Sequence, residues 1–130
     1  MRRPVAKYLS IIDSSYRATI EEQDDTAVWF THAMKNGGAD VSILLRGDAV
    51  NYAVSGQDAK GLRFGSRTVK GPDIVRDIQA VIANKIPLYA VADDLAERGI
   101  AASGLIAGVE QVQRSAIARL IETHDRILSW

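Results

Sequence analysis

Residues 40–46, Asp-Val-Ser-Ile-Leu-Leu-Arg, decide the fold class of this chain. Apolar side chains follow one another here almost without interruption, which is typical of a strand that is buried on both faces. Such strands belong to parallel sheets with helices on either side. Four other segments are predicted strands: residues 5–12, 88–92, 108–112 and 126–130. The strand pattern of residues 108–112 is weak.

Helical patterns lie between these predicted strands. Their apolar positions are Ala27, Phe30, Ala33 and Met34; Ile74, Val75, Ile78, Val81 and Ile82; and Ile117, Leu120 and Ile121. Pro72 suits the first position of the second helix, and Asp94 with Glu97 resembles a capping box that begins a further short helix ending near Gly99. Alternating strands and helices predict one α/β domain over residues 1–130, with three α/β/α layers around a mostly parallel five-stranded sheet.

Two further segments have less regular patterns. Residues 48–54 predict a short helical turn. Residues 55–71 combine glycines with Lys60, Arg63, Arg67 and Lys70 and show no clean periodicity, so we predict a long mobile loop. The spacing of Gly56 and Gly61 opens a P-loop pattern, but Leu62-Arg63 stands where Lys-Ser/Thr is required, so the motif fails.

Composition excludes several classes of function. The chain has 47% hydrophobic and 25% charged residues, as ordinary globular proteins do, and no cysteine. It therefore lacks a thiol, a disulfide framework and cysteine-based zinc sites. Sixteen basic residues balance sixteen acidic ones, so we expect no nucleic-acid partner. No run approaches the length that spans a bilayer and no signal-peptide pattern follows the first residues, so we expect a cytoplasmic protein without a membrane partner.

The chain resembles the DsrE-like family of small proteins, which includes sulfur-relay subunits. The resemblance is carried by residues 47–50 (Gly-Asp-Ala-Val), by residues 88–91 (Leu-Tyr-Ala-Val) and above all by residues 97–100 (Glu-Arg-Gly-Ile). It implies the family fold and a closed homo-oligomer, with a trimer or hexamer favoured. In the sulfur-relay members, a persulfide-carrying cysteine ends the strand before the Arg-Gly helix, and that position falls at about Val91 here. Because valine has no nucleophile, sulfur transfer would need a partner protein from sulfur metabolism to supply the thiol.

Candidate ligand-binding residues lie at the predicted carboxyl ends of strands, where open α/β sheets bind ligands. Asp13, Ser14, Asp48 and Asp93 are such residues, and Arg63 and Arg67 add cations from the glycine-rich segment. Carboxylates at one sheet edge also suit Mg²⁺, but receiver-type sites need an acidic pair after the first strand and only Asp13 stands there. We therefore expect neither a metal nor a cofactor, and we assign no catalytic residue.

Three functional hypotheses remain open, the third being a scaffold that binds no ligand. In the first, the chain is a binding or assembly subunit of DsrE type that works in sulfur metabolism without carrying sulfur. In the second, it is an enzyme or sensor for a small anion, bound by the strand ends and residues 56–71.

Trp130, at the end of the predicted last strand, is expected either at a subunit contact or folded onto its own core.

Overall fold

The computed structural model describes residues 5–19 and 22–130 and confirms the α/β/α prediction. The central sheet has five strands, all parallel, in the order β6-β5-β2-β1-β7. Its strands are β1 (Lys7–Ile12), β2 (Asp40–Leu45), β5 (Leu88–Val91), β6 (Glu110–Val112) and β7 (Arg126–Ser129). The predicted weak strand and the predicted last strand form the two edges of this sheet.

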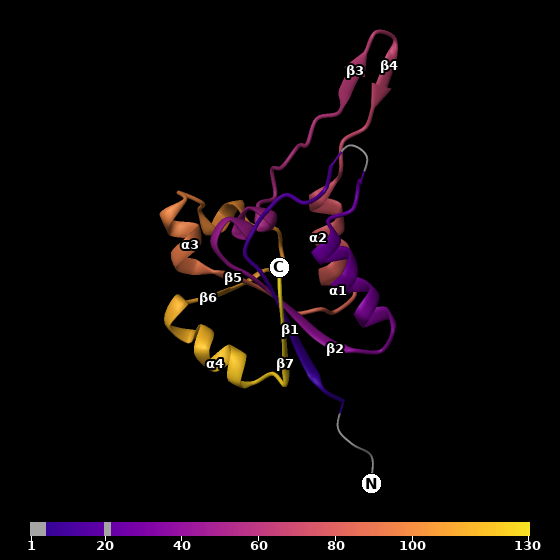
Figure 1. Ribbon diagram of the computed structural model, residues 1–130. Coiled ribbons are helices and arrows are strands. Elements are labelled where there is room, and N and C mark those ends of the chain that lie inside the picture. Colours follow the sequence, from indigo (N-terminus) through magenta and orange to yellow (C-terminus); the bar gives the residue numbers. More distant parts are fainter. Residues whose placement is uncertain (1–4, 20–21) are drawn as a thin grey trace.

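Helices cover both faces of the sheet (Figure 1). The helical elements are α1 (Thr26–Asn36), α2 (Ile74–Ala83), α3 (Ala92–Glu97) and α4 (Ile117–Glu122), with the short 3₁₀ helices η1 (Gly47–Ala53), η2 (Ala102–Gly104) and η3 (Arg114–Ala116). Residues from α1, α2 and η1 form the larger core with one sheet face. On the other face Ile117 of α4 packs in a smaller core with Leu9, Leu44 and Val91.

The middle strand β2 shows why the fold could be predicted. Its residues from Val41 to Leu45 are all buried, since one set of alternating side chains faces α1 and α2 and the other faces α4. Only Ser42 interrupts this apolar run, and it is 5% exposed. Pairing of β2 with both β1 and β5 then places it at the centre of the domain.

Two helix starts differ from the prediction. Helix α2 begins after Asp73, whose carboxylate accepts a hydrogen bond from the backbone N–H of Arg76, so Pro72 precedes the cap instead of opening the helix. Helix α3 begins directly after Val91, with no side-chain cap. The predicted capping box is therefore wrong, because Asp94 lies inside the helix and its carboxylate is used in contacts with other elements.

Residues 55–71 do not form the predicted irregular loop. They contain β3 (Leu62–Phe64) and β4 (Arg67–Val69), which pair antiparallel and project from the domain as a hairpin (Figure 1). The prediction failed because each strand is only three residues long and none of its residues is buried in the main core, so the sequence signal for a strand is weak. We call residues 59–71 the projecting hairpin.

Trp130 folds back onto its own chain. Its indole Nε1–H donates to the Ser10 hydroxyl at 2.9 Å, and its ring lies 5.6 Å from the ring of Phe30, measured between centroids. Its backbone N–H also continues the pairing by donating to the Ile11 carbonyl. Of the two roles expected for this residue, the structure shows packing within the chain.

Candidate functional site

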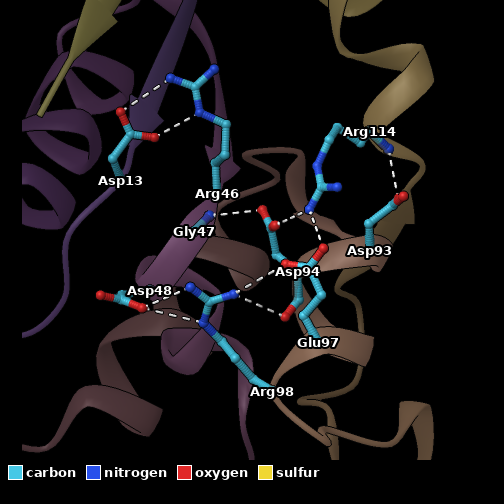
Figure 2. Close-up of polar contacts among 9 residues, drawn as sticks. All are labelled: Asp13, Arg46, Gly47, Asp48, Asp93, Asp94, Glu97, Arg98 and Arg114. Atoms are coloured by element: carbon cyan, nitrogen blue, oxygen red, sulfur yellow. Dashed lines mark hydrogen bonds and ion pairs between the residues drawn. The ribbon is translucent and has the colours of Figure 1, made fainter.

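The carboxyl ends of three neighbouring strands bring charged side chains together at one edge of the sheet. Asp13 follows β1, Arg46 follows β2, and Asp93 and Asp94 lie in the first turn of α3 after β5. Because β2 pairs with both β1 and β5 in parallel, these ends are adjacent. We call this group, together with Asp48, Glu97, Arg98 and Arg114, the strand-end cluster (Figure 2).

Asp13 and Arg46 form a bidentate ion pair. Arg46 Nε lies 2.7 Å from Asp13 Oδ1 and its terminal nitrogen lies 3.1 Å from Oδ2. This hydrogen-bonded carboxylate raises the pKa of Arg46 above its ordinary value, in spite of partial desolvation. Both carboxylate oxygens of Asp13 are thus engaged by a permanent cation.

Asp94 is the buried carboxylate of the cluster, 6% exposed as a residue. One oxygen accepts the backbone N–H of Gly47 at 2.8 Å, and the other accepts from Arg114 at 2.6 Å. Burial alone would raise the pKa of Asp94, but these hydrogen bonds hold it below the ordinary value. Gly47 has a φ of +58°, a conformation that glycine adopts without strain, and its turn directs the N–H toward Asp94.

The outer part of the cluster is also paired. Arg98 donates to Asp48 Oδ1 at 2.8 Å, and Arg114 donates to Glu97 Oε1 at 2.9 Å. The backbone N–H of Arg114 donates to Asp93 Oδ1 at 2.8 Å. The pKa values of both arginines are raised, chiefly by the hydrogen bonds that Arg98 donates to Asp48 and that Arg114 donates to Glu97. The cluster therefore contains five acids and three arginines, and each arginine is hydrogen-bonded to at least one carboxylate of the cluster.

The structure thus brings together Asp13, Asp48 and Asp93 of the predicted site residues. Ser14 lies beside Asp13 and accepts, through its carbonyl oxygen, a hydrogen bond from Arg17 at 3.3 Å. Arg63 and Arg67 are elsewhere, in the projecting hairpin (Figure 1). Sequence reasoning missed Arg98 and Arg114 as partners of these acids; Arg98 stood in the Glu-Arg-Gly-Ile stretch, whereas nothing marked Arg114.

Val91, at the predicted position of the family cysteine, is completely buried. It is the last residue of β5, and its side chain packs in the smaller core with Leu9, Leu44 and Ile117. A thiol in this orientation would be enclosed by aliphatic groups. The first partly exposed position beyond the strand is Ala92, which opens α3.

A hollow lies at the root of the projecting hairpin, with a volume of about 670 Å³. Its walls include Lys60 and Lys70 from the two arms of the hairpin and Tyr16 from the segment after β1. The Tyr16 hydroxyl donates to Gln57 Oε1 at 2.7 Å, which ties that segment to the chain leading into the hairpin. The volume lies within the range of roughly 300–1,000 Å³ that is usual for small-molecule sites.

Comparison with known protein families identifies the family of this chain. The model of the DsrE/DsrF-like family matches residues 8–130. The chain belongs to this family. No curated protein sequence matches this DsrE-like chain significantly.

Two solved structures share the DsrE-like fold of this chain. The YchN protein from E. coli is 21% identical, with a TM-score of 0.70 over 98% of this chain and 100% of YchN. MTH1491 from Methanobacterium thermoautotrophicum, a protein of unknown function, is 15% identical, with a TM-score of 0.58 over 96% of this chain and 99% of its own. At these identities the likeness shows the fold.

Within residues 5–19 and 22–130, no group of three or more His, Cys, Asp or Glu residues is arranged to hold a metal ion. In the same described part of the chain, no helix is long and apolar enough to span a membrane. The charged groups of the strand-end cluster are hydrogen-bonded to one another and to backbone N–H groups.

Proposed function

We propose that this chain is a non-catalytic, cytoplasmic subunit of a DsrE-like assembly in sulfur metabolism, which binds other protein chains and does not itself carry sulfur. One observation carries the proposal: a DsrE-like fold over residues 8–130 is combined with a sequence that has no cysteine. Persulfide transfer requires a thiolate nucleophile. A chain of this kind contributes binding surface while a cysteine-bearing partner carries the sulfur.

The strand-end cluster supports a binding role over catalysis. The pKa of Asp94 is held below its ordinary value by Gly47 and Arg114, whereas a general base that works near neutral pH needs a raised one. Asp13 and Asp48 are each paired with an arginine. Fixed ion pairs of this kind hold strand ends and helices in place.

Two kinds of protein partner follow from this proposal. One is a cysteine-bearing DsrE-like chain from the same organism, and the other is a second copy of this chain in a trimer or hexamer. The test mixes the protein with such a partner whose thiol carries sulfane sulfur. We expect native mass spectrometry to show a mixed complex and intact mass to place all added sulfur on the partner. Absence of any mixed complex, or a gain of one sulfur atom by this chain, would contradict the proposal.

A second candidate function is favoured by the hollow at the hairpin root. Lys60 and Lys70 line its two sides, and cations there suit a small anion such as thiosulfate or phosphate. A ligand at 100 times its dissociation constant stabilises the folded state by about 2.7 kcal/mol. A thermal-shift screen with these anions tests this candidate. We expect any stabilisation to be lost in Lys60→Ala and Lys70→Ala and retained in Lys85→Ala, a matched control outside the hollow.

A further inference from the structure

The projecting hairpin carries an apolar face that its own chain leaves uncovered. Phe64 is 63% exposed and Leu62 is 49% exposed. The register pairs Leu62 with Val69 and Phe64 with Arg67, so these four side chains share one face of the hairpin, whereas Arg63 and Thr68 occupy the other. A two-stranded ribbon is only marginally stable alone in water, so a covering partner would stabilise it.

The root of the hairpin holds its two arms unusually close. A Cβ atom added to Gly61 would lie 1.9 Å from the carbonyl oxygen of Val69, and one added to Gly71 would lie 1.8 Å from that of Ala59. Only glycine permits this approach of the two backbones. The Gln23 side chain also donates to the Lys70 carbonyl at 2.9 Å. The arms are therefore held together before binding, which lowers the entropic cost of docking.

The hairpin is basic, and the remainder of the chain is correspondingly acidic. The projecting hairpin, residues 59–71, contains four cations and no anion, a net charge of +4. The whole chain has a net charge of 0, which leaves −4 for the rest. Within the described residues, every ion pair belongs to the strand-end cluster. The cations of the hairpin have no carboxylate partner among those pairs.

A hollow between α1 and α2 is lined by acidic residues, so its charge is opposite to that of the projecting hairpin. Its volume is about 220 Å³, and its lining comprises Asp24, Asp25, Val28, Trp29, His32, Asp77 and Ala80. Trp29 at its rim is 57% exposed. Burial and the nearby charge of Asp24 raise the pKa of Asp77, a sign that negative charge accumulates there. The volume is below the usual range for small-molecule sites, roughly 300–1,000 Å³, and suits one large side chain.

We propose that the projecting hairpin of one copy docks over the α1–α2 hollow of a second copy. Phe64 enters the hollow beside Trp29, where aromatic contact and burial of exposed apolar surface stabilise the complex. Arg67, on the same face as Phe64, meets Asp24 and Asp77 of the second copy. The inference rests on the self-association in the proposed function and identifies the two surfaces that would produce it.

The experiment measures the dissociation constant of the homo-oligomer by sedimentation equilibrium and light scattering. We expect Phe64→Ala and Arg67→Glu each to weaken association by about tenfold or more, since they lie on the docking face. Arg63→Glu makes the same charge change on the opposite face and should weaken association less than Arg67→Glu. Asp24→Arg, at an exposed position, should weaken association as Arg67→Glu does.

The decisive variant combines Arg67→Glu with Asp24→Arg in one chain. Because the reversed charges again attract across the contact, we expect its dissociation constant to return to within about threefold of the wild-type value. Circular dichroism checks that each variant is folded. A wild-type chain that stays monomeric at every concentration would refute the proposed self-association. An oligomeric wild type that is unchanged by Phe64→Ala and Arg67→Glu would overturn the hairpin contact alone.

Discussion

Asp94 offers the sharpest test of the strand-end cluster, because it links three elements through one buried carboxylate. Its oxygens accept from the backbone N–H of Gly47 at the start of η1 and from Arg114 of η3, while its own backbone belongs to α3. Truncation to alanine removes both acceptors. The Gly47 N–H then loses its partner in a position that is only partly open to water.

The expected magnitude comes from the Gly47 contact. A hydrogen bond to a charged group contributes about 1.5–3 kcal/mol, and an unpaired donor that is shielded from water costs a similar amount. We therefore expect Asp94→Ala to lower the free energy of unfolding by about 2 kcal/mol. For a domain of 130 residues, unfolding entropy of roughly 2.1 cal/mol/K per residue converts this loss to a melting-temperature decrease of about 7 °C.

Asp94→Asn tests the charge separately from the shape. The pKa of Asp94 is lowered in the folded protein, so its ionisation stabilises the fold above the ordinary aspartate pKa of about 4. That contribution disappears as the pH falls through the lowered pKa, where the native carboxylate is also protonated. We expect the wild type to be more stable than Asp94→Asn at pH 7, with the difference narrowing progressively below about pH 4.

The assays are urea unfolding and thermal melting, both followed by circular dichroism between pH 3 and pH 7. Asp48→Ala is the matched control, because the Asp48 side chain is 73% exposed and its ion pair with Arg98 is open to solvent. We expect its melting temperature to stay within about 2 °C of the wild type. The reasoning fails if Asp94→Ala is no more destabilising than this control, or if the Asp94→Asn difference is equally large at pH 3 and pH 7.

Three other expectations concern the hairpin, the carboxyl end and the position of the family cysteine. Gly61→Ala should separate the hairpin arms and speed tryptic cleavage within residues 59–71 severalfold, whereas Gly56→Ala, whose added Cβ meets nothing within 4 Å, should leave the cleavage rate unchanged. Trp130→Ala removes the ring contact with Phe30 and the donor to Ser10, so urea unfolding should show a loss of about 2 kcal/mol; an unchanged midpoint would contradict that packing role. Val91→Cys should react with a thiol reagent only after unfolding, whereas Ala92→Cys should react in the native state, and fast native labelling at position 91 would show that the strand end opens.

The sheet could be predicted because a strand that is buried on both faces has a nearly continuous run of apolar residues. Residues 40–46 are nearly all apolar, and the structure places this strand at the centre of the sheet. The carboxyl ends of the strands then followed from topology, which is why Asp13, Asp48 and Asp93 were expected at one edge. Both inferences depend on short-range pattern and on the general rule for parallel sheets.

The partners of those acids could not be predicted, because they are distant in sequence. Asp94 and Gly47 are separated by 47 residues, and Asp94 and Arg114 by 20. No periodicity links such pairs, and arginines on a polar surface look alike in sequence. The hairpin was missed for a different reason. Strands β3 and β4 are only three residues long and neither is buried, so the alternation in Leu62, Arg63 and Phe64 is too short to signal a strand.

Substitutions in the strand-end cluster and in the projecting hairpin are expected to affect different properties of the protein. In the strand-end cluster, Arg46, Arg98 and Arg114 are each bonded to carboxylates of the same chain, so their charges are largely satisfied before any partner arrives. In the projecting hairpin and the α1–α2 hollow, opposite charges lie on separate surfaces beside the exposed rings of Phe64 and Trp29. Charges that are unpaired within one chain gain most from a second one. We therefore expect charge reversal in the hairpin to change association, and charge removal in the strand-end cluster to change stability.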